Sequence, residues 1–493
     1  MCFNIICIVS TFLVIYYQDL LPTVPAVQKI SFSSALNAAI SFTTGTFWQS
    51  HNPETELTIM SHIFALTAQN FISGATGIAV FIAFTRGIVN SQNQLIGNFY
   101  DDFLRALLLI LLPLALCVAI ILISFGTPHD LVGTISYKNL QGAEESLYLG
   151  PIAGQVAIKN LVANGGSMLA SASAHPFEAP SRAAVMLNLF LIVVTPTAMI
   201  FTYGFLVGAP RLSWALYSVV NLVMISSLLI INLGETDYGL PYIFGDNLLN
   251  DNFNYTGKEL IYDKFPSLMW VLSITMSSDG SANACLENYS PLSTLVLFSN
   301  LIMSKFVIEG VGSGFFAMLS YLVIAVFLRG LITGETANFF GKRITTNEIN
   351  YVIIVFLIMP VGVLAFTSVT LLLPYSQDLI TYHGSQAVTD ITYNFASSFA
   401  NNGSNFSGID ISTDYFNYMT ALAMFLGRYL IIFFSLAISG SFARKKRLGN
   451  QISKYTQSSL ELSVSLLITV MLVGAITFLP LMILGPLLEF INM

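Results

Sequence analysis

Charge is the scarcest feature of this sequence. Only 9% of its 493 residues are Asp, Glu, Lys or Arg, against roughly 25% in an ordinary soluble domain. Hydrophobic residues make up 55%, and the mean hydropathy is +0.74. The composition therefore predicts an all-α polytopic membrane protein embedded in a lipid bilayer.

Basic blocks and cysteine patterns are also missing. The 26 acidic and 19 basic side chains give a net charge of -7, which argues against nucleic acid as a partner. The cysteines Cys2, Cys7, Cys117 and Cys285 have neither metal-ligand nor disulfide spacing, so we interpret them as membrane-packing residues. We expect no bound metal other than a transported ion.

The motifs of ATP hydrolysis are absent as well. The chain has no Walker-type phosphate loop, no D-K-T-G-T phosphorylation site and no soluble segment large enough to bind ATP. No organic cofactor is expected, and energy coupling must come from a partner or be absent.

Nine apolar segments approach the roughly 20 residues that a membrane span needs. They cover residues 3–20, 58–84, 103–125, 184–207, 213–232, 294–328, 350–374, 416–440 and 464–488. Arg and Lys gather at the connections after the second, fourth, sixth and eighth segments. The positive-inside rule therefore predicts that these connections and the N-terminus are cytoplasmic, with the C-terminus outside.

The other four connections each contain an apolar segment too short to cross the membrane, followed by a small polar cluster with a glycine. The short segments are 31–42, 152–162, 264–275 and 389–400. Segments of this length are typical of re-entrant pieces that are buried in protein or line water. The clusters consist of Thr43, Thr44, Gly45 and Thr46; Ala163, Asn164, Gly165 and Gly166; Ser278, Asp279, Gly280 and Ser281; and Asn401, Asn402, Gly403 and Ser404.

The central glycines recur at nearly regular intervals of 120, 115 and 123 residues (45 to 165, 165 to 280, 280 to 403). This spacing predicts four related units of span, half-helix and span around a central pore. The predicted units are residues 1–86, 87–210, 211–345 and 346–447, and residues 448–493 form one extra C-terminal span.

Each cluster has the composition of a cation filter. Glycine accepts backbone angles closed to other residues, so successive carbonyl groups can turn toward one axis and replace the hydration shell of an ion. A half-helix that ends there adds its partial negative charge. The alternative is that these residues only form turns between apolar runs, and the fourfold recurrence favours the filter.

Six motifs resemble the potassium-binding subunit family of the Kdp potassium-transporting ATPase. They are SFTTGTFWQS (41–50), LTAQNFISGATGIAV (66–80), GPIAGQVAIKNLVANGG (150–166), SAHPFE (173–178), EGVGSGFF (309–316) and NNGSNFSG (401–408). The resemblance implies that the four loops select potassium, with Gln49 close beside them. It also implies a non-hydrolysing, multi-pass subunit of the bacterial inner membrane, whose partners are a P-type ATPase catalytic subunit and small accessory membrane subunits.

The chain departs from the family pattern at several positions. The family usually begins with an additional span, commonly has Asn where this chain has Gly45, and commonly has Cys where this chain has Asp279. The usual Glu and Gly of the sixth segment are replaced by Lys305 and Glu309, and an Arg is replaced by Glu335.

Ionisable residues inside apolar segments suggest an ion path or a gate. Lys305 and Glu309 share a helix face and either line a path or neutralise each other. Gly312 and Gly314 either break the helix as a gate or allow close packing. Arg428 either partners a carboxylate or repels cations. His175 is expected to be a hydrogen-bonding group of its loop.

We therefore expect the channel-like, potassium-binding subunit of an ATP-driven uptake complex. One alternative is a stand-alone potassium channel or gradient-driven transporter of the same superfamily. Another is a subunit that assembles but no longer transports, suggested by Lys305, Glu309 and Glu335.

Overall fold

The computed structural model of the chain describes residues 2–21, 28–89, 95–131, 133–237, 253–258, 263–307, 315–334, 336–373, 384–446, 459–485, 487–488 and 491. Within these residues, seven helical segments are long and apolar enough to cross a membrane. They are Ile59–Val89, Phe99–Ser124, Arg182–Val207, Pro210–Thr236, Phe315–Thr333, Thr346–Leu372 and Asp414–Ala443. The chain is therefore a mostly helical, multi-pass membrane protein.

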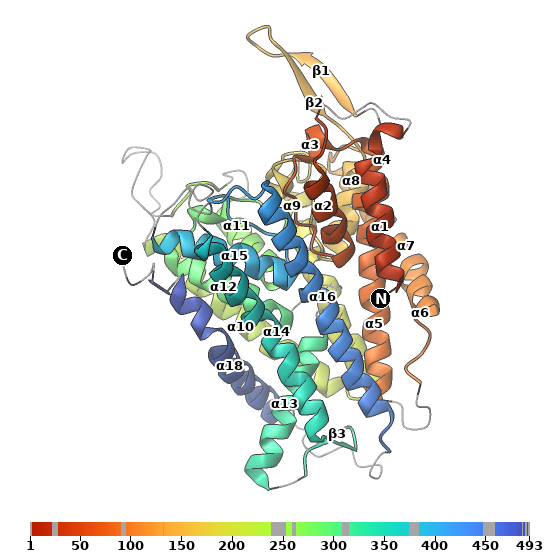
Figure 1. Cartoon of the computed structure of the whole chain (residues 1–493), viewed down its shortest axis with the longest axis vertical. Coiled ribbons are helices and arrows are strands. Elements are labelled where there is room, and N and C mark those ends of the chain that lie inside the picture. The colour runs from red at the N-terminus through yellow and green to blue at the C-terminus, as the bar shows by residue number, and fades with distance from the viewer. Residues whose placement is uncertain are drawn as a thin grey trace.

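The helices run side by side in one bundle (Figure 1). In chain order they are α1 (Cys2–Tyr16), α2 (Phe32–Thr44), α3 (Pro53–Glu56), α4 (Ile59–Ser61), α5 (Ala68–Val89), α6 (Phe99–Arg105), α7 (Leu112–Ser124), α8 (Ile152–Leu161), α9 (Arg182–Val207), α10 (Pro210–Asp237), α11 (Lys264–Met276), α12 (Pro291–Val307), α13 (Phe315–Thr333), α14 (Thr346–Leu372), α15 (Ser385–Ala400), α16 (Asp414–Ala443) and α18 (Ser459–Leu484). The π-helical turns His62–Thr67 and Ala106–Leu111 join α4 to α5 and α6 to α7.

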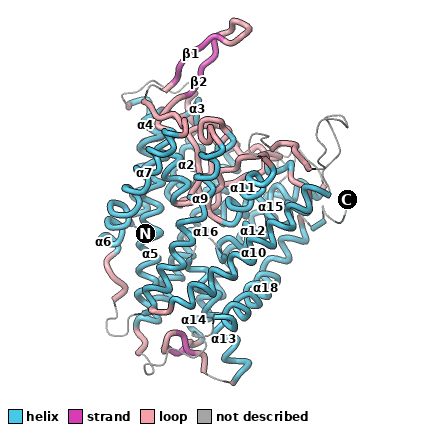
Figure 2. Tube along the Cα trace, turned by 180° about the vertical axis from the view of Figure 1, so that it is seen from behind, coloured by secondary structure: helices cyan, strands magenta, loops and turns pink. Residues whose placement is uncertain are grey.

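Two short antiparallel hairpins lie at opposite ends of the bundle. Strands β1 (Thr134–Lys138) and β2 (Glu144–Tyr148) pair with Thr134 opposite Tyr148. They project well beyond the helices in both views (Figures 1 and 2). Strands β3 (Asn338–Phe339) and β4 (Lys342–Arg343) form the smaller hairpin. The hairpins thus mark the two faces of the membrane protein.

The four half-length helices are confirmed. Residues 31–42, 152–162, 264–275 and 389–400 correspond to α2, α8, α11 and α15, whose ends differ from the expected ones by at most four residues. Local chemistry fixes some of these ends. The Ser31 hydroxyl accepts the N–H of Ser34 at the start of α2, and Gly45 ends it in the left-handed conformation with φ of 72°, as a C-capping glycine does.

The predicted single span 294–328 is wrong. This stretch contains two helices, α12 and α13, and of the two only α13 qualifies as a full span. The hydropathy pattern joins them because both are apolar and only a short sequence separates them. Glu309, Gly312, Gly314 and Glu335 lie outside the described residues, and so does the side chain of Lys305, which belongs to α12. The proposed ion path and gate therefore stay predictions.

The connections that were expected to share one side of the membrane meet in space. The ammonium group of Lys342, in β4, donates to the carbonyl oxygen of Gly87 at 3.0 Å. Lys445, just after α16, donates to Glu348 of α14 at 2.6 Å. These contacts lie at the end of the bundle that carries β3, opposite the hairpin β1–β2 (Figure 1). The connections after the second, sixth and eighth predicted segments thus share one face.

Helix α16 lies very close to the half-helix α15. A Cβ atom on Gly427 would collide with the backbone carbonyl of Phe399, two residues before the fourth glycine cluster. A small residue at such a crossing lets two backbones approach. Gly440, in the same helix, has no neighbouring atom within 4 Å of the corresponding position.

We expect Gly427→Ala to lower the unfolding free energy by about 1–3 kcal/mol, because overpacking forces the two backbones apart. Gly440→Ala is the matched control. It should be neutral or stabilising by up to about 1 kcal/mol, since Ala is the better helix former. Thermal unfolding of both variants in detergent checks this, and equal shifts in the two would contradict the assigned contact.

Candidate functional site

The site consists of four loops, each following one half-length helix. We name residues 45–50 the first loop, 162–168 the second, 277–283 the third and 401–407 the fourth. They contain all the predicted cluster residues except Thr43 and Thr44, which occupy the last turn of α2, where their hydroxyls donate to the carbonyl oxygens of Ala39 and Ser41. Nearly all the cluster residues are buried.

The four central glycines pack against the loops in a cyclic order. A Cβ atom on Gly45 would lie 3.5 Å from Asn164 Oδ1 of the second loop, and one on Gly165 would lie 3.0 Å from the Gly280 nitrogen of the third. A Cβ atom on Gly280 would collide with the Ser404 nitrogen of the fourth loop, and one on Gly403 with the Thr46 carbonyl of the first. Each glycine therefore faces the next loop, and the sequence of contacts closes on itself.

Hydrogen bonds join three of the four neighbouring pairs of loops. Gln49 and Ser167 connect the first and second loops by a pair of bonds of 2.9 Å, one through each group of the Gln49 amide. The amide of Asn402 donates to the carbonyl oxygens of Ile274 and Ser277, at 2.7 and 2.9 Å, and so holds the fourth loop on the third.

The fourth loop returns to the first through Asn401. Its amide donates to Thr46 Oγ1 at 2.9 Å and to the Met424 carbonyl of α16 at 3.0 Å. The second loop is anchored to α5 because the Asn164 amide donates to Ser73 Oγ at 2.8 Å. The ring is thus fixed to the long helices that surround it.

The glycines of the ring are needed for two different physical reasons. Gly45, Gly165, Gly166 and Gly403 have positive φ angles between 72° and 96°, a region that favours glycine. Gly280 is not among the positive-φ residues, so its need for glycine comes from the backbone of the fourth loop beside it. The expectation that all four glycines serve unusual backbone angles is therefore wrong for the third loop.

The half-length helices all end at the ring. The helices α2, α8, α11 and α15 end within four residues of their loop's central glycine. A helix C-terminus carries a partial negative charge of roughly half an elementary charge. Four such ends around the ring contribute negative potential, which favours a cation there.

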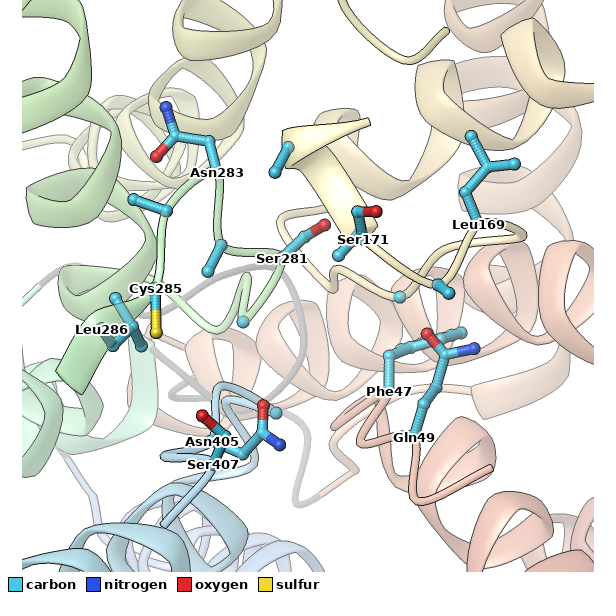
Figure 3. Close-up of a pocket in the computed structure, with 18 of the residues that line it drawn as sticks. Phe47, Gln49, Leu169, Ser171, Ser281, Asn283, Cys285, Leu286, Asn405 and Ser407 are labelled. Carbon is cyan, nitrogen blue, oxygen red and sulfur yellow. The ribbon is translucent and has the colours of Figure 1, made fainter. Parts of the chain in front are cut away.

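A cavity of about 360 Å³ opens directly on the ring (Figure 3). Its lining comes from all four loops and the segments that follow them, and includes Gly166, Gly280, Ser281 and Gly403 of the predicted filter, together with Gln49. The side chains of Gln49, Ser281 and Asn405 approach it from three directions. Cys285 also lines this cavity and is exposed, so its interpretation as a packing residue is wrong.

His51 adds no positive charge to this cavity. Burial, followed by the nearby His62, lowers the pKa of His51 to about 3. The imidazole lining the cavity is therefore neutral at physiological pH. A cation in the cavity meets no opposing charge from this side chain.

Four further predicted residues lie among the described residues. Arg428, in α16, is 2% exposed, and its Nη2 lies 3.7 Å from the position of a Cβ atom on Gly45. His175 accepts the N–H of Phe177 at 3.1 Å through Nδ1, which confirms it as a hydrogen-bonding group of its loop. Ser278 and Asp279 are fully buried, and Asp279 Oδ1 accepts the N–H of Ser281 at 3.0 Å.

Sequence reasoning missed a buried ion pair behind the second and third loops. Lys159 of α8 pairs with Glu178, and their side chains are 0% and 1% exposed. Both belong to motifs singled out in the sequence, GPIAGQVAIKNLVANGG and SAHPFE. A lysine in an apolar half-helix was the available signal, because such a charge is rarely buried unless it is paired.

Known proteins resemble this chain over nearly its whole length. The family model described as the potassium-transporting ATPase A subunit matches residues 1–491. The potassium-transporting ATPase potassium-binding subunit of Leptospira interrogans is 35% identical over 99% of this chain and 87% of its own length. That of Rhodospirillum centenum is 34% identical over 100% of this chain and 86% of its own length, and that of Francisella tularensis subsp. novicida is 32% identical over 100% and 87%.

The fold also resembles a solved transporter. The potassium transporter TrkH from Vibrio parahaemolyticus superposes with a TM-score of 0.53 at 15% identity, over 83% of this chain and 78% of that one. At this identity the likeness concerns the fold alone. By its nearly full-length sequence match, the chain belongs to the family of potassium-transporting ATPase A subunits.

Proposed function

We propose that this chain binds potassium in the ring of four loops and serves as the channel-like subunit of an ATP-driven potassium uptake complex in a bacterial inner membrane. The observation that carries the proposal is the cyclic order in which each central glycine packs on the next loop. Family membership supports potassium as the ion, since the relatives are described as potassium-binding subunits.

The proposed chemistry is dehydration of the ion. Backbone carbonyl oxygens of the four loops replace water around the cation, and the C-terminal ends of α2, α8, α11 and α15 stabilise its charge. The filter residues are those of the four clusters, with Gln49 fixing the first loop to the second. The ion enters the ring of loops from the adjoining cavity.

The proposed domain organisation follows the same fourfold pattern. Residues 1–86, 87–210, 211–345 and 346–447 each contribute one half-helix and one loop, and residues 448–493 add the helix α18. A P-type ATPase catalytic subunit, together with small accessory membrane subunits, supplies the energy, because this sequence carries no ATP-hydrolysis motif.

We predict that Gly280→Ala weakens potassium binding about fivefold or more. The added methyl group collides with the backbone of Ser404, and an overpacking cost of about 1–3 kcal/mol falls on the binding site itself. Gly474→Ala in α18 is the matched control, since the nearest atom to its Cβ position is 3.6 Å away. Calorimetric titration of the purified chain with potassium and sodium measures the effect. Equal potassium affinities for the two variants would refute the filter.

Co-purification tests the energy source. A tagged full chain expressed with its chromosomal neighbours is expected to carry a stoichiometric P-type ATPase subunit and potassium-stimulated ATP hydrolysis. Potassium flux through the chain alone in liposomes, without such a partner, would instead support a stand-alone channel or gradient-driven transporter. A partner-bound chain without ion binding would support a subunit that assembles but does not transport.

A further inference from the structure

The buried pair Lys159–Glu178 reaches three of the four loops. The ammonium group of Lys159 donates to Ser281 Oγ in the third loop at 2.9 Å and to Ser173 Oγ at 3.0 Å. Glu178 accepts from Ser167 Oγ in the second loop at 2.5 Å. Through its backbone, Ser167 holds Gln49 of the first loop. One ion pair therefore lies at the junction of these loops.

Ser281 is held from several sides at this junction. Its hydroxyl lies between Lys159 and Ser173, with the latter contact at 2.6 Å. The indole N–H of Trp270 donates to its carbonyl oxygen at 3.0 Å, and its own N–H donates to Asp279 Oδ1 at 3.0 Å. Ser281 directly follows Gly280, so these bonds also fix the backbone that faces the fourth loop.

The cost of burying this pair indicates a role beyond holding the fold together. Removing two charges from water costs several kcal/mol per ion, and apolar residues of similar volume often serve stability as well or better. A lysine in a cation filter's wall also opposes the cation unless its charge is neutralised, as Glu178 neutralises it here. What the pair provides is a set of charge-assisted hydrogen bonds that hold the loop residues bonded to it in one geometry.

We propose that Lys159, held by Glu178, is a positioning residue that sets ion discrimination by fixing Ser281 and the third loop. The inference rests on the proposed function of the ring as a potassium filter. Discrimination between ions of similar size requires the ligands to be held within a few tenths of an ångström of their positions, as functional sites generally require. The ion pair provides that rigidity from behind the loop.

A second buried pair supplies a matched control. Lys258 and Glu235 have side chains that are 1% and 0% exposed, with Nζ and Oε2 2.9 Å apart. The pair is bonded to Asn254, Asn288 and Ser290, which lie outside the four loops. It resembles Lys159–Glu178 in chemistry and burial, but it lies beside the segment that follows the third loop.

The experiment neutralises each pair as a unit, so that no single buried charge remains. Lys159→Met with Glu178→Gln, Lys258→Met with Glu235→Gln, and Ser281→Ala are compared with the parent chain in the intact complex. The apparent KM and kcat of stimulated ATP hydrolysis are measured with potassium, rubidium and sodium.

We expect the Lys159–Glu178 double variant to raise the apparent KM for potassium. The preference for potassium, which is the KM for rubidium or sodium divided by the KM for potassium, should fall about tenfold, the loss of about one charged hydrogen bond. Ser281→Ala should change the same ratio in the same direction, because it removes the group that Lys159 positions. The Lys258–Glu235 variant should keep the parent ratio, even if it lowers thermal stability.

The outcomes separate the proposals. An unchanged ion ratio in a folded Lys159–Glu178 variant, or an equal change in the Lys258–Glu235 variant, overturns the positioning role. If the Lys159–Glu178 variant does not assemble, the test rests on Ser281→Ala. An unchanged ion preference in Ser281→Ala then overturns the positioning role of Lys159. A failed filter is recognised separately, because the parent chain then binds no potassium in the titration used for Gly280→Ala.

Discussion

The structure depends on one constraint, which is that non-helical backbone at membrane depth must find its polar partners within the protein. The four loops meet this constraint by bonding to one another and to the helices that precede them. Thr46 and Phe47, for example, both donate to the Ser41 carbonyl in α2, while Asn402 satisfies two carbonyl groups of its neighbour. Neighbouring loops thus satisfy part of one another's hydrogen-bonding groups.

The long helices hold this unit in place. Helix α16 packs against α2, α5, α14 and α15 and thus joins the first and fourth quarters of the chain. Its Met424 carbonyl accepts from Asn401, and its Gly427 allows α15 to approach. Helix α18 packs along α10, α12, α13, α14 and α15 on the other side. The long spans on both sides therefore hold the ring of loops in position.

Much of this arrangement could be predicted because its signals are local. Length and hydropathy distinguish a half-helix from a span, and a recurring glycine after each half-helix predicts four equivalent loops. The signals that failed were not local. Residues 294–328 read as one span because hydropathy averages over the glycines between α12 and α13. Gly280 could not be distinguished from the positive-φ glycines, because the backbone that excludes a side chain there lies more than 120 residues away. The pairing of Lys159 with Glu178 likewise could be recognised only from the three-dimensional structure.

The cyclic packing of the glycines also has a consequence for the evolution of such a sequence. A side chain added at Gly280 or Gly403 would collide with the backbone of the neighbouring loop, not with its own loop. Contacting positions are energetically coupled, so their effects do not add. Compensating changes would therefore arise as pairs across adjacent loops, and the four quarters of the chain, although far apart in sequence, would be inherited as a single co-adapted set.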